Sequence, residues 1–288
     1  EEEEEIVMTV QNNPAGVSAA LYGLRAGLKV TLVGKDGGAL SKAHLIQNYY
    51  GLEKAVTGEE LLEIGKKQAL ELGAEIVDDE VTDLMYDGAA FVATGLKGVY
   101  RAKTCIMATG AARKKQPLAG MAEMEGHGVS YCAVCDAFFY RQKDVAVMGS
   151  GEYALHEAQE LLQVVRSVTL LTNGTALTAK FPESVRVDER PLKGLLGEGV
   201  FQGVLFADGS KQKFDGLFVA LGSANATDLA LKAGAAFDLG KMVLDENLQS
   251  TIPGLFAAGD CTGGVLQISV AVGEGARAGL AAIKYLRE

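Results

Sequence analysis

The sequence predicts an α/β protein of two related Rossmann-like three-layer domains, with the second domain inserted in the first. The chain opens with a strand–turn–helix–strand unit that returns without gaps, so that Val7–Val10 correspond to Val145–Met148. At the same offset, Val30–Val33 correspond to Val168–Leu171. The tail Val243–Glu288 repeats nothing. If this tail completes the first domain, the second domain must be an insertion.

The composition is that of a folded chain. Of 288 residues, 48% are apolar and 22% are charged, and this length favours two domains over one. The net charge is −10, half of it from the Glu1–Glu5 run, which argues against a nucleic acid or an anionic membrane as partner. The longest uncharged run, Ile6–Leu24, contains Asn and Pro residues and follows acidic ones, so neither a membrane span nor a signal peptide is predicted. We therefore expect a cytoplasmic protein.

The elements of the first domain follow from their apolar patterns. Ile6–Val10 is a short run with β-branched residues, which is typical of a strand, and residues 15–26 carry apolar side chains at helical spacing. After the strand at Val30–Val33, further strands are expected around Val81–Tyr86, Ala90–Thr94 and Cys105–Met107.

The second domain continues in the same way. Its later strands are expected around Val185–Val187, Val200–Phe206 and Leu217–Leu221. Each domain should thus combine a parallel sheet with a β-meander, as in nucleotide-binding domains. The expected domains are 1–112 together with 243–288, and 113–242, joined by a pair of hinge segments.

The first strand–helix turn should supply a phosphate cradle, in which a tight turn brings a helix N-terminus to the ligand. Of the pattern Gly-x-Gly-x-x-Gly, the segment Gln11–Gly16 retains only the third glycine, Gly16. Asn tolerates left-handed backbone better than most residues, so Asn13 is predicted to form the turn. An ordinary strand–helix turn without a ligand is the alternative.

The second turn, Gly149–Ala154, is a complete Gly-x-Gly-x-x-Ala in the correct context. A ribose hydroxyl would require an acid after the next strand, and a 2′-phosphate would require Arg. The chain has Thr172-Asn173-Gly174 there. We therefore interpret the glycines as a turn geometry inherited from a nucleotide-binding fold, not as a site that still binds a nicotinamide cofactor.

The sharpest motif is Cys132-Ala133-Val134-Cys135-Asp136. Two thiols at this spacing can close a disulfide and exchange it with a partner, and Asp136 is a candidate proton carrier. A zinc site would need two more ligands, and only His127 is near in sequence, while Cys105 and Cys261 lie in other contexts. We predict no metal; zinc and a buried pair of inert thiols are the alternatives.

At these residues the chain closely resembles the low-molecular-weight thioredoxin reductases. Residues 128–136 are nearly their redox motif, and residues 256–260 followed by Gln267 resemble their flavin-closing segment. Gly37 and Gly38, followed by Asn48, match the loop over the flavin. The resemblance spans residues 6–287.

The resemblance implies a homodimeric enzyme with FAD in the first domain. It implies that Asp260 binds the ribitol or diphosphate region and that the helix after Gln267 points at the isoalloxazine ring. It implies that Cys135 faces the flavin, that Cys132 attacks thioredoxin, and that Asp136 donates protons. The expected cofactor-binding residues are Asn13, Pro14, Ala15, Gly16, Gly34, Gly38, Lys42, Asn48, Val81, Thr109, Gly110, Gly259, Asp260, Gln267 and Ile268.

Three departures from the family pattern concern nucleotides. Gly34 replaces a Glu after the second strand, Asn13 replaces a glycine, and residues 172–174 replace a His-Arg-Arg clamp for NADPH. The lost clamp and Leu40-Ser41-Lys42 resemble the ferredoxin-dependent flavin thioredoxin reductases, so ferredoxin is the expected electron donor. Its docking candidates are Arg113, Lys114 and Lys115, or Arg141 and Lys143.

Three other functions remain as alternatives. The first is an ordinary NADPH-dependent thioredoxin reductase, against which the missing clamp argues. The second is a ferredoxin–NADP reductase of related fold, in which Cys132 and Cys135 would have no role. The third is a non-enzymatic redox sensor or interaction module, suggested by the degenerate first turn.

Overall fold

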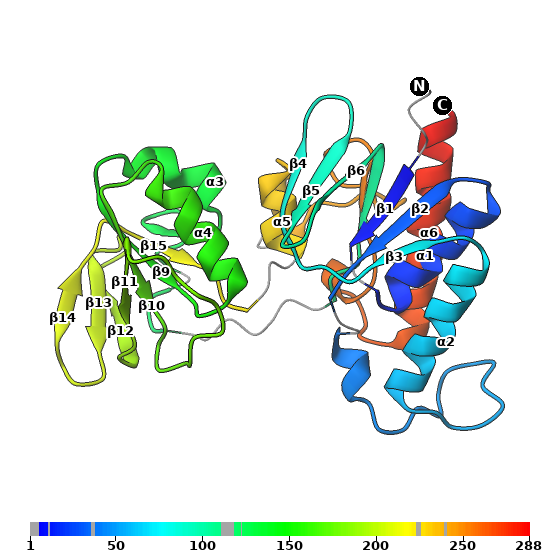
Figure 1. Cartoon of the computed structure of the whole chain (residues 1–288), viewed down its shortest axis with the longest axis horizontal. Helices are drawn as coiled ribbons and strands as arrows, with labels where there is room; N and C mark the ends of the chain where they lie inside the picture. The colour runs from blue at the N-terminus through cyan, green and yellow to red at the C-terminus, as the bar shows by residue number, and fades with distance from the viewer. Residues whose placement is uncertain are drawn as a thin grey trace. The chain divides into compact units, whose positions relative to one another are not determined.

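The computed structural model describes residues 6–10, 12–35, 38–110, 118–121, 123–222, 226–238 and 241–288. They form two compact units, one from the described parts of 1–112 and 225–288 and the other from those of 113–224 (Figure 1). Gln11, Gly37 and Arg113–Lys115, which carry parts of the predicted motifs, lie outside the described residues.

The first unit is built on a parallel sheet whose five described strands have the order β18-β7-β1-β2-β3. In β1, Met8 lies opposite Thr31 of β2 on one side and Cys105 of β7 on the other. Because all the strands run the same way, their carboxyl ends meet at one edge of the sheet. The strands are β1 (Ile6–Val10), β2 (Lys29–Val33), β3 (Glu75–Val77), β7 (Thr104–Met107) and β18 (Leu255–Ala257).

Helices cover one side of this sheet and an antiparallel meander covers the other (Figure 1). The helices are α1 (Pro14–Arg25), α2 (Gly58–Glu71) and α6 (Ile268–Arg287), and the meander is β4 (Val81–Tyr86), β5 (Phe91–Gly95) and β6 (Val99–Ala102). Helix α2 begins with a capping box, in which the Glu60 amide donates to Thr57 Oγ1 and the Thr57 amide donates to Glu60 Oε2. Short 3-10 turns are η1 (Gly38–Lys42) and η3 (Asp260–Thr262).

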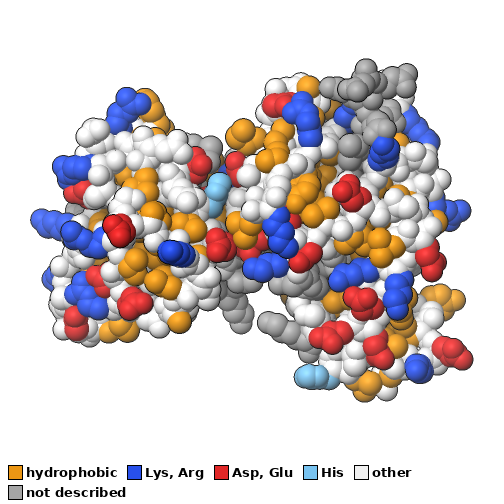
Figure 2. Space-filling view, viewed as in Figure 1, with side chains coloured by type: hydrophobic (Ala, Val, Ile, Leu, Met, Phe, Trp, Pro, Cys, Tyr) orange, Lys and Arg blue, Asp and Glu red, His pale blue; other side chains and the backbone are white. Residues whose placement is uncertain are grey.

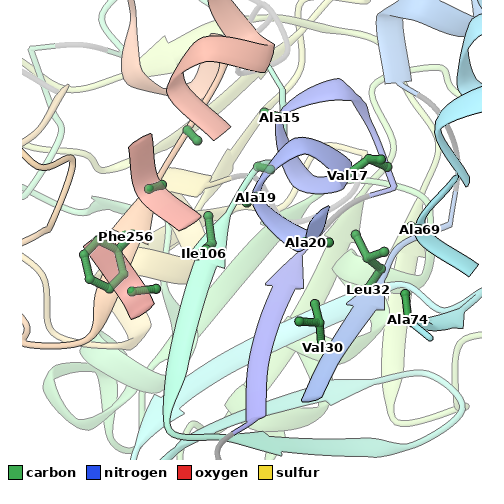
Figure 3. Packing of buried hydrophobic residues seen from close by; sticks show 14 of the residues in the cluster. Ala15, Val17, Ala19, Ala20, Val30, Leu32, Ala69, Ala74, Ile106 and Phe256 are labelled. Carbon is green, nitrogen blue, oxygen red and sulfur yellow. The ribbon is translucent and has the colours of Figure 1, made fainter. Parts of the chain in front are cut away.

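Small side chains let α1 pack tightly in the core of this unit. Ala15, Ala19 and Ala20 of α1 are buried near Ile106 of β7 and Phe256 of β18 (Figure 3). The same helix meets α6, where the Ser18 hydroxyl donates to the Val272 carbonyl at 2.8 Å. The contact between α1 and α6 therefore joins the beginning and the end of the described chain.

The second unit repeats the plan. Its five described parallel strands have the order β11-β10-β9-β15-β8, with α3 (Ala133–Asp136), η2 (Ala137–Tyr140) and α4 (Glu152–Leu162) as its helices. The strands are β8 (Val129–Ser130), β9 (Asp144–Met148), β10 (Ser167–Leu171), β11 (Val185–Asp188) and β15 (Gly216–Val219). The antiparallel meander is β12 (Leu192–Leu196), β13 (Gly203–Phe206) and β14 (Lys211–Lys213). The predicted fold class, two related α/β Rossmann-like domains, is confirmed.

The second boundary between the units lies before residue 243, where the sequence prediction places it. Helix α5 (Ala226–Lys232) and the short strands β16 (Phe237–Asp238) and β17 (Lys241–Met242) belong to the first unit, not to the inserted one. The reason is packing, because α5 lies against β4 and the Lys232 ammonium donates to the Thr82 carbonyl at 3.0 Å.

Acidic and basic side chains are interspersed over the visible face of each unit (Figure 2). In the part of the chain that the structure describes, no helix is both long enough and apolar enough to span a bilayer.

Candidate functional site

Four of the predicted cofactor residues follow strands at the carboxyl edge of the first sheet. Asn13 follows β1, Gly34 follows β2, Thr109 follows β7, and Gly259 follows β18. In open parallel sheets, ligands bind outside this edge. The topology thus brings together residues that are more than 200 positions apart in the sequence.

Asn13 begins helix α1, and it does so differently from the sequence prediction. Its backbone is extended, with φ −122°, rather than left-handed. The physical reason is capping: Asn13 Oδ1 accepts a hydrogen bond from the Gly16 amide at 3.1 Å, and an N-cap residue takes extended backbone. Its Nδ2 donates to the Ala108 carbonyl, which ties the helix to the strand beside it. Pro14 and Ala15 occupy the first turn behind the cap.

The neighbouring loops leave polar groups and space at the same edge. The Thr109 hydroxyl is buried and has no hydrogen-bond partner among the described residues. Gly110 has a left-handed backbone, φ +75°, and a Cβ atom there would meet none of the described residues within 4 Å. An unpartnered buried hydroxyl beside open space fits a polar ligand. The Gly34 carbonyl accepts from Nδ2 of Asn12 at 2.9 Å, a contact that the sequence did not suggest.

The turn after β18 is held by a residue that sequence reasoning missed. The Gly259 amide donates to Glu274 Oε2 at 2.8 Å, and the Thr262 hydroxyl donates to the same oxygen at 3.0 Å. Gly259 has φ +81°, and a Cβ atom there would lie 2.9 Å from that of Ala15. This turn presents Asp260, and burial, followed by the nearby Glu274 carboxylate, raises the pKa of Asp260.

Two predicted residues from distant segments are in contact. Asn48 Nδ2 donates to Gln267 Oε1 at 3.3 Å, which places the loop before α2 beside the N-terminus of α6. Beside Asn13 and Ile268 lies a mostly apolar cavity of about 240 Å³, whose other walls are α1, α2 and residues 49–52. Gly38 and Lys42 bound η1, and Val81 is buried at the start of β4.

In the second unit, Cys132 and Cys135 are joined in a disulfide at the start of α3. The Cys135 amide donates to Cys132 Sγ at 3.1 Å, so the first cysteine also caps this helix. Cys132 is 2% exposed, whereas Cys135 is at the surface.

A hydrogen-bonded serine links this disulfide to Asp136. The Ser130 hydroxyl donates to Asp136 Oδ2 at 2.7 Å and accepts from the Cys132 amide at 3.1 Å. The three predicted redox residues therefore form one connected group, and Ser130 is the member that the sequence did not reveal.

The other two cysteines lie elsewhere, in the first unit. Burial raises the pKa of the Cys105 thiol, and it raises the pKa of Cys261 to about 12. Within the described ranges, no group of three or more His, Cys, Asp and Glu side chains could hold a metal ion.

The glycine turn after β9 has its own intramolecular partners. The Thr178 amide donates to the Ser150 carbonyl at 2.9 Å, so the segment after β10 folds back onto the turn. Asn173 has φ +52°, and its Oδ1 accepts from the Leu192 amide at 2.6 Å. The described side chains of residues 172–174 are uncharged, and some polar groups of this segment already form hydrogen bonds within the protein.

Comparison with known proteins decides the family. A family model described as pyridine nucleotide-disulphide oxidoreductase matches residues 7–275. The chain belongs to the pyridine nucleotide-disulphide oxidoreductases.

Relatives that align over nearly their whole length include a thioredoxin reductase of Peptoclostridium acidaminophilum, 34% identical, with 96% of this chain and 95% of that protein covered. Among solved structures, the atypical thioredoxin reductase TRi from Desulfovibrio vulgaris Hildenborough has 38% identity and a TM-score of 0.91, with 99% and 98% of the chains covered. A ferredoxin-flavin thioredoxin reductase from Clostridium acetobutylicum has 28% identity and a TM-score of 0.75, with 99% and 98% covered. The resemblance to low-molecular-weight thioredoxin reductases is confirmed.

Oxidoreductases of this kind carry FAD. The first unit fits that cofactor, because its carboxyl edge offers a capped helix N-terminus, a buried unpartnered hydroxyl at Thr109 and the tight turn at Gly259.

Proposed function

We propose that this flavin disulfide oxidoreductase reduces thioredoxin through Cys132 and Cys135, takes its electrons from ferredoxin rather than NADPH, and acts in the cytoplasm as a homodimer. The observation that carries the proposal is the disulfide at the start of α3, linked through Ser130 to a carboxylate.

The residues around the disulfide suit proton-coupled exchange. When bound, FAD accepts electrons from a donor and delivers two of them to a disulfide. Opening the Cys132–Cys135 bond also takes up two protons, and Asp136 lies next to Cys135 in the chain. The Ser130 hydroxyl keeps the Asp136 carboxylate within reach of the pair. We assign proton transfer to Asp136, contact with the flavin to Cys135, and attack on thioredoxin to Cys132. Because Cys132 is 2% exposed in the disulfide form, this assignment requires that its sulfur becomes accessible once the disulfide opens.

Exposed aromatic side chains beside the disulfide support a protein as the oxidant. Phe138 and Phe139 follow α3 and are 69% and 68% exposed. The Arg141 guanidinium stands 5.2 Å from the centre of the Phe138 ring. Aromatic and arginine side chains are favoured at protein interfaces, so this surface suits docking of thioredoxin.

The residues that would meet NADPH support a different electron donor. NADPH carries a 2′-phosphate, which Arg recognises with paired hydrogen bonds. The neutral residues 172–174 offer no such pair, and two lost contacts of about 1.5–3 kcal/mol each would weaken binding by roughly two to four orders of magnitude. The nearby Arg190 is already committed, since it pairs with Asp188 and Asp208 and stacks 3.7 Å from the Phe206 ring centre.

A carrier protein is the remaining donor class, and the ferredoxin-flavin enzyme among the structural relatives favours ferredoxin. Arg141 and Lys143 are exposed and suit an acidic carrier. The alternative donor is NADPH, which the intact Gly149–Ala154 turn and the many relatives named simply thioredoxin reductase favour.

Anaerobic stopped-flow reduction of the flavin tests the donor. Reduced ferredoxin is expected to bleach the flavin absorbance far faster than NADPH or NADH, at a rate that falls as salt rises. Fast reduction by micromolar NADPH would overturn the ferredoxin assignment and leave an ordinary thioredoxin reductase.

Single cysteine variants test the roles within the pair. Cys135→Ser is expected to trap a stable mixed disulfide between Cys132 and thioredoxin, whereas Cys132→Ser should not trap thioredoxin. Both variants should lose turnover. Substantial thioredoxin reduction by either variant would refute the mechanism, and trapping by Cys132→Ser instead would reverse the two roles.

A further inference from the structure

A buried carboxylate accepts a hydrogen bond from the backbone within the redox motif, and the proposed mechanism does not use it. Glu157 projects from α4 and is 1% exposed. Its Oε2 accepts a hydrogen bond from the Ala133 amide at 2.7 Å. That amide nitrogen is bonded to the carbonyl carbon of Cys132, so the carboxylate adjoins the sulfur-bearing residue.

Glu157 accepts the hydrogen bond of one amide that could otherwise stabilise a thiolate. Amides at the start of a helix lower thiol pKa values in Cys-x-x-Cys motifs. Here the Cys135 amide donates to Cys132 Sγ, while the Ala133 amide donates to Glu157. A carboxylate that competes for these donors, and that repels negative charge, opposes the ionised form of the reduced pair.

We propose that Glu157 is a positioning residue that lowers the reduction potential of the Cys132–Cys135 pair and so makes it a stronger reductant. The proposal deepens the proposed function and rests on it for its biological purpose, since a disulfide that must pass electrons to thioredoxin benefits from a low potential.

Reduction breaks one S–S bond and takes up two electrons and two protons, which gives two thiols; with dithiothreitol as reductant, both come from its two thiols as its own disulfide closes. At a pH where one product thiol ionises, a group that stabilises the thiolate draws the equilibrium toward the dithiol. A neighbouring carboxylate destabilises the thiolate, so the equilibrium moves toward the disulfide.

Glu157→Gln is the test, because glutamine keeps the shape and can still accept from the Ala133 amide while it removes the charge. Glu160→Gln is the matched control, since it removes the same charge from the same helix, where Glu160 is only half-buried. The FAD-loaded proteins are equilibrated anaerobically with mixtures of reduced and oxidised dithiothreitol at several pH values. Acid quenching, alkylation and mass spectrometry then give the fraction of each protein with the Cys132–Cys135 pair reduced.

In Glu157→Gln the dithiol–disulfide equilibrium is expected to move about tenfold toward the dithiol at alkaline pH, which corresponds to a potential about 30 mV higher. The shift should shrink at acidic pH, where neither product thiol ionises. The pH profile for alkylation of the reduced pair should move to lower pH. Glu160→Gln should match the wild type. Glu157→Gln leaves every other titratable side chain on α3, η2 and α4 in place. Besides the two cysteines, these side chains are Asp136, Tyr140, Glu152, Tyr153, His156 and Glu160.

An unchanged equilibrium in Glu157→Gln would overturn the proposal, as would a shift that is the same at every pH or an equal shift in Glu160→Gln. If Glu157→Gln does not fold with flavin bound, Glu157→Asp takes its place; its carboxylate withdraws by one methylene and should give a smaller shift in the same direction. No shift in Glu157→Asp would then reject the idea. Failure to reduce thioredoxin at all would refute the proposed function but would leave this equilibrium measurement readable.

Discussion

Helix α6 approaches helix α1 so closely that position 275 has no room for a side chain. A Cβ atom on Gly275 would lie 2.9 Å from the carbonyl carbon and 3.0 Å from the Cα atom of Ala15, and closer still to its carbonyl oxygen. Carbon atoms in contact normally lie about 3.5–4.0 Å apart. Gly275→Ala must therefore open the contact by roughly 1 Å, and because the obstacle is backbone, no side-chain rotation can relieve it.

The expected cost follows from two opposing effects. Overpacking costs about 1–3 kcal/mol, and a backbone obstacle belongs at the upper end of that range. Alanine stabilises the helix by about 1 kcal/mol relative to glycine, because its helix propensity is higher. The net loss is about 2 kcal/mol, which lowers the Tm by about 4–8 °C for a unit of this size. Because α1 carries the capped N-terminus and α6 carries Gln267 at its start, FAD occupancy should fall as well.

Gly273→Ala is the matched control on the same helix. Position 273 is exposed, and a Cβ atom there would meet nothing within 4 Å. This substitution should therefore raise the Tm, by about 2–4 °C for about 1 kcal/mol of helix propensity. Thermal unfolding and the ratio of flavin to protein absorbance measure both effects. If Gly275→Ala unfolds at or above the temperature of Gly273→Ala, the close approach of the two helices is wrong.

Three further predictions concern titratable groups. After reduction at pH 8, Cys105 and Cys261 should not be alkylated quickly, because burial raises the pKa of Cys105 and raises that of Cys261 to about 12; rapid labelling of either, seen by mass spectrometry, would contradict this. The side chain of Arg166 holds the pKa of Asp144 at about 2 in the folded protein, below its unfolded value of about 3.9. The ionised Asp144 therefore contributes its full stabilisation above about pH 4, and this stabilisation is lost as pH falls toward 2. Asp144→Asn should thus lower the Tm at pH 7 and flatten its decline in acid, and a parallel decline in both proteins would argue against the assignment. Asp260→Ala should lower the flavin-to-protein ratio of the purified protein, and full occupancy would remove Asp260 from the cofactor site.

The repeated architecture was predictable because both copies place an apolar strand, a turn and a second strand at the same offset. Strand β9 has the place in the second sheet that β1 has in the first, with β10 and β2 as the matching neighbours. Helix α5 was not assigned to the correct unit. It is short, and its packing partner, β4, lies far away in the sequence, so the local pattern carries no signal of which unit it joins.

Residues within one loop were easier to predict than residues that bridge elements. The turn at Gly259 and Asp260 and the pair Cys132 and Cys135 are visible as local motifs. Asn13 was placed in the correct turn but with the wrong backbone, because its capping bond to Gly16 outweighs its tolerance of left-handed conformations.

The carboxylates Glu157 and Glu274 were missed because each contacts an element distant in sequence. One signal was available for Glu157: it falls on the buried face of α4, in register with Tyr153, Ala154 and Leu161. A charged residue within an apolar stripe is costly to bury, so it indicates a specific partner.

The contact between α1 and α6 also affects how the protein is made. The core of the first unit contains both Ala15 and Ala282, so it cannot close until residue 282 has left the ribosome. Among the described residues, the core cluster of the inserted unit lies between Met121 and Val219, with Leu118 and Leu221 packed against it. During synthesis the disulfide unit can therefore fold while the first unit still waits for its last helix. Strand β7 lacks its partner β18 over that interval, so the open edge of β7 is the part of the nascent sheet most in need of a chaperone.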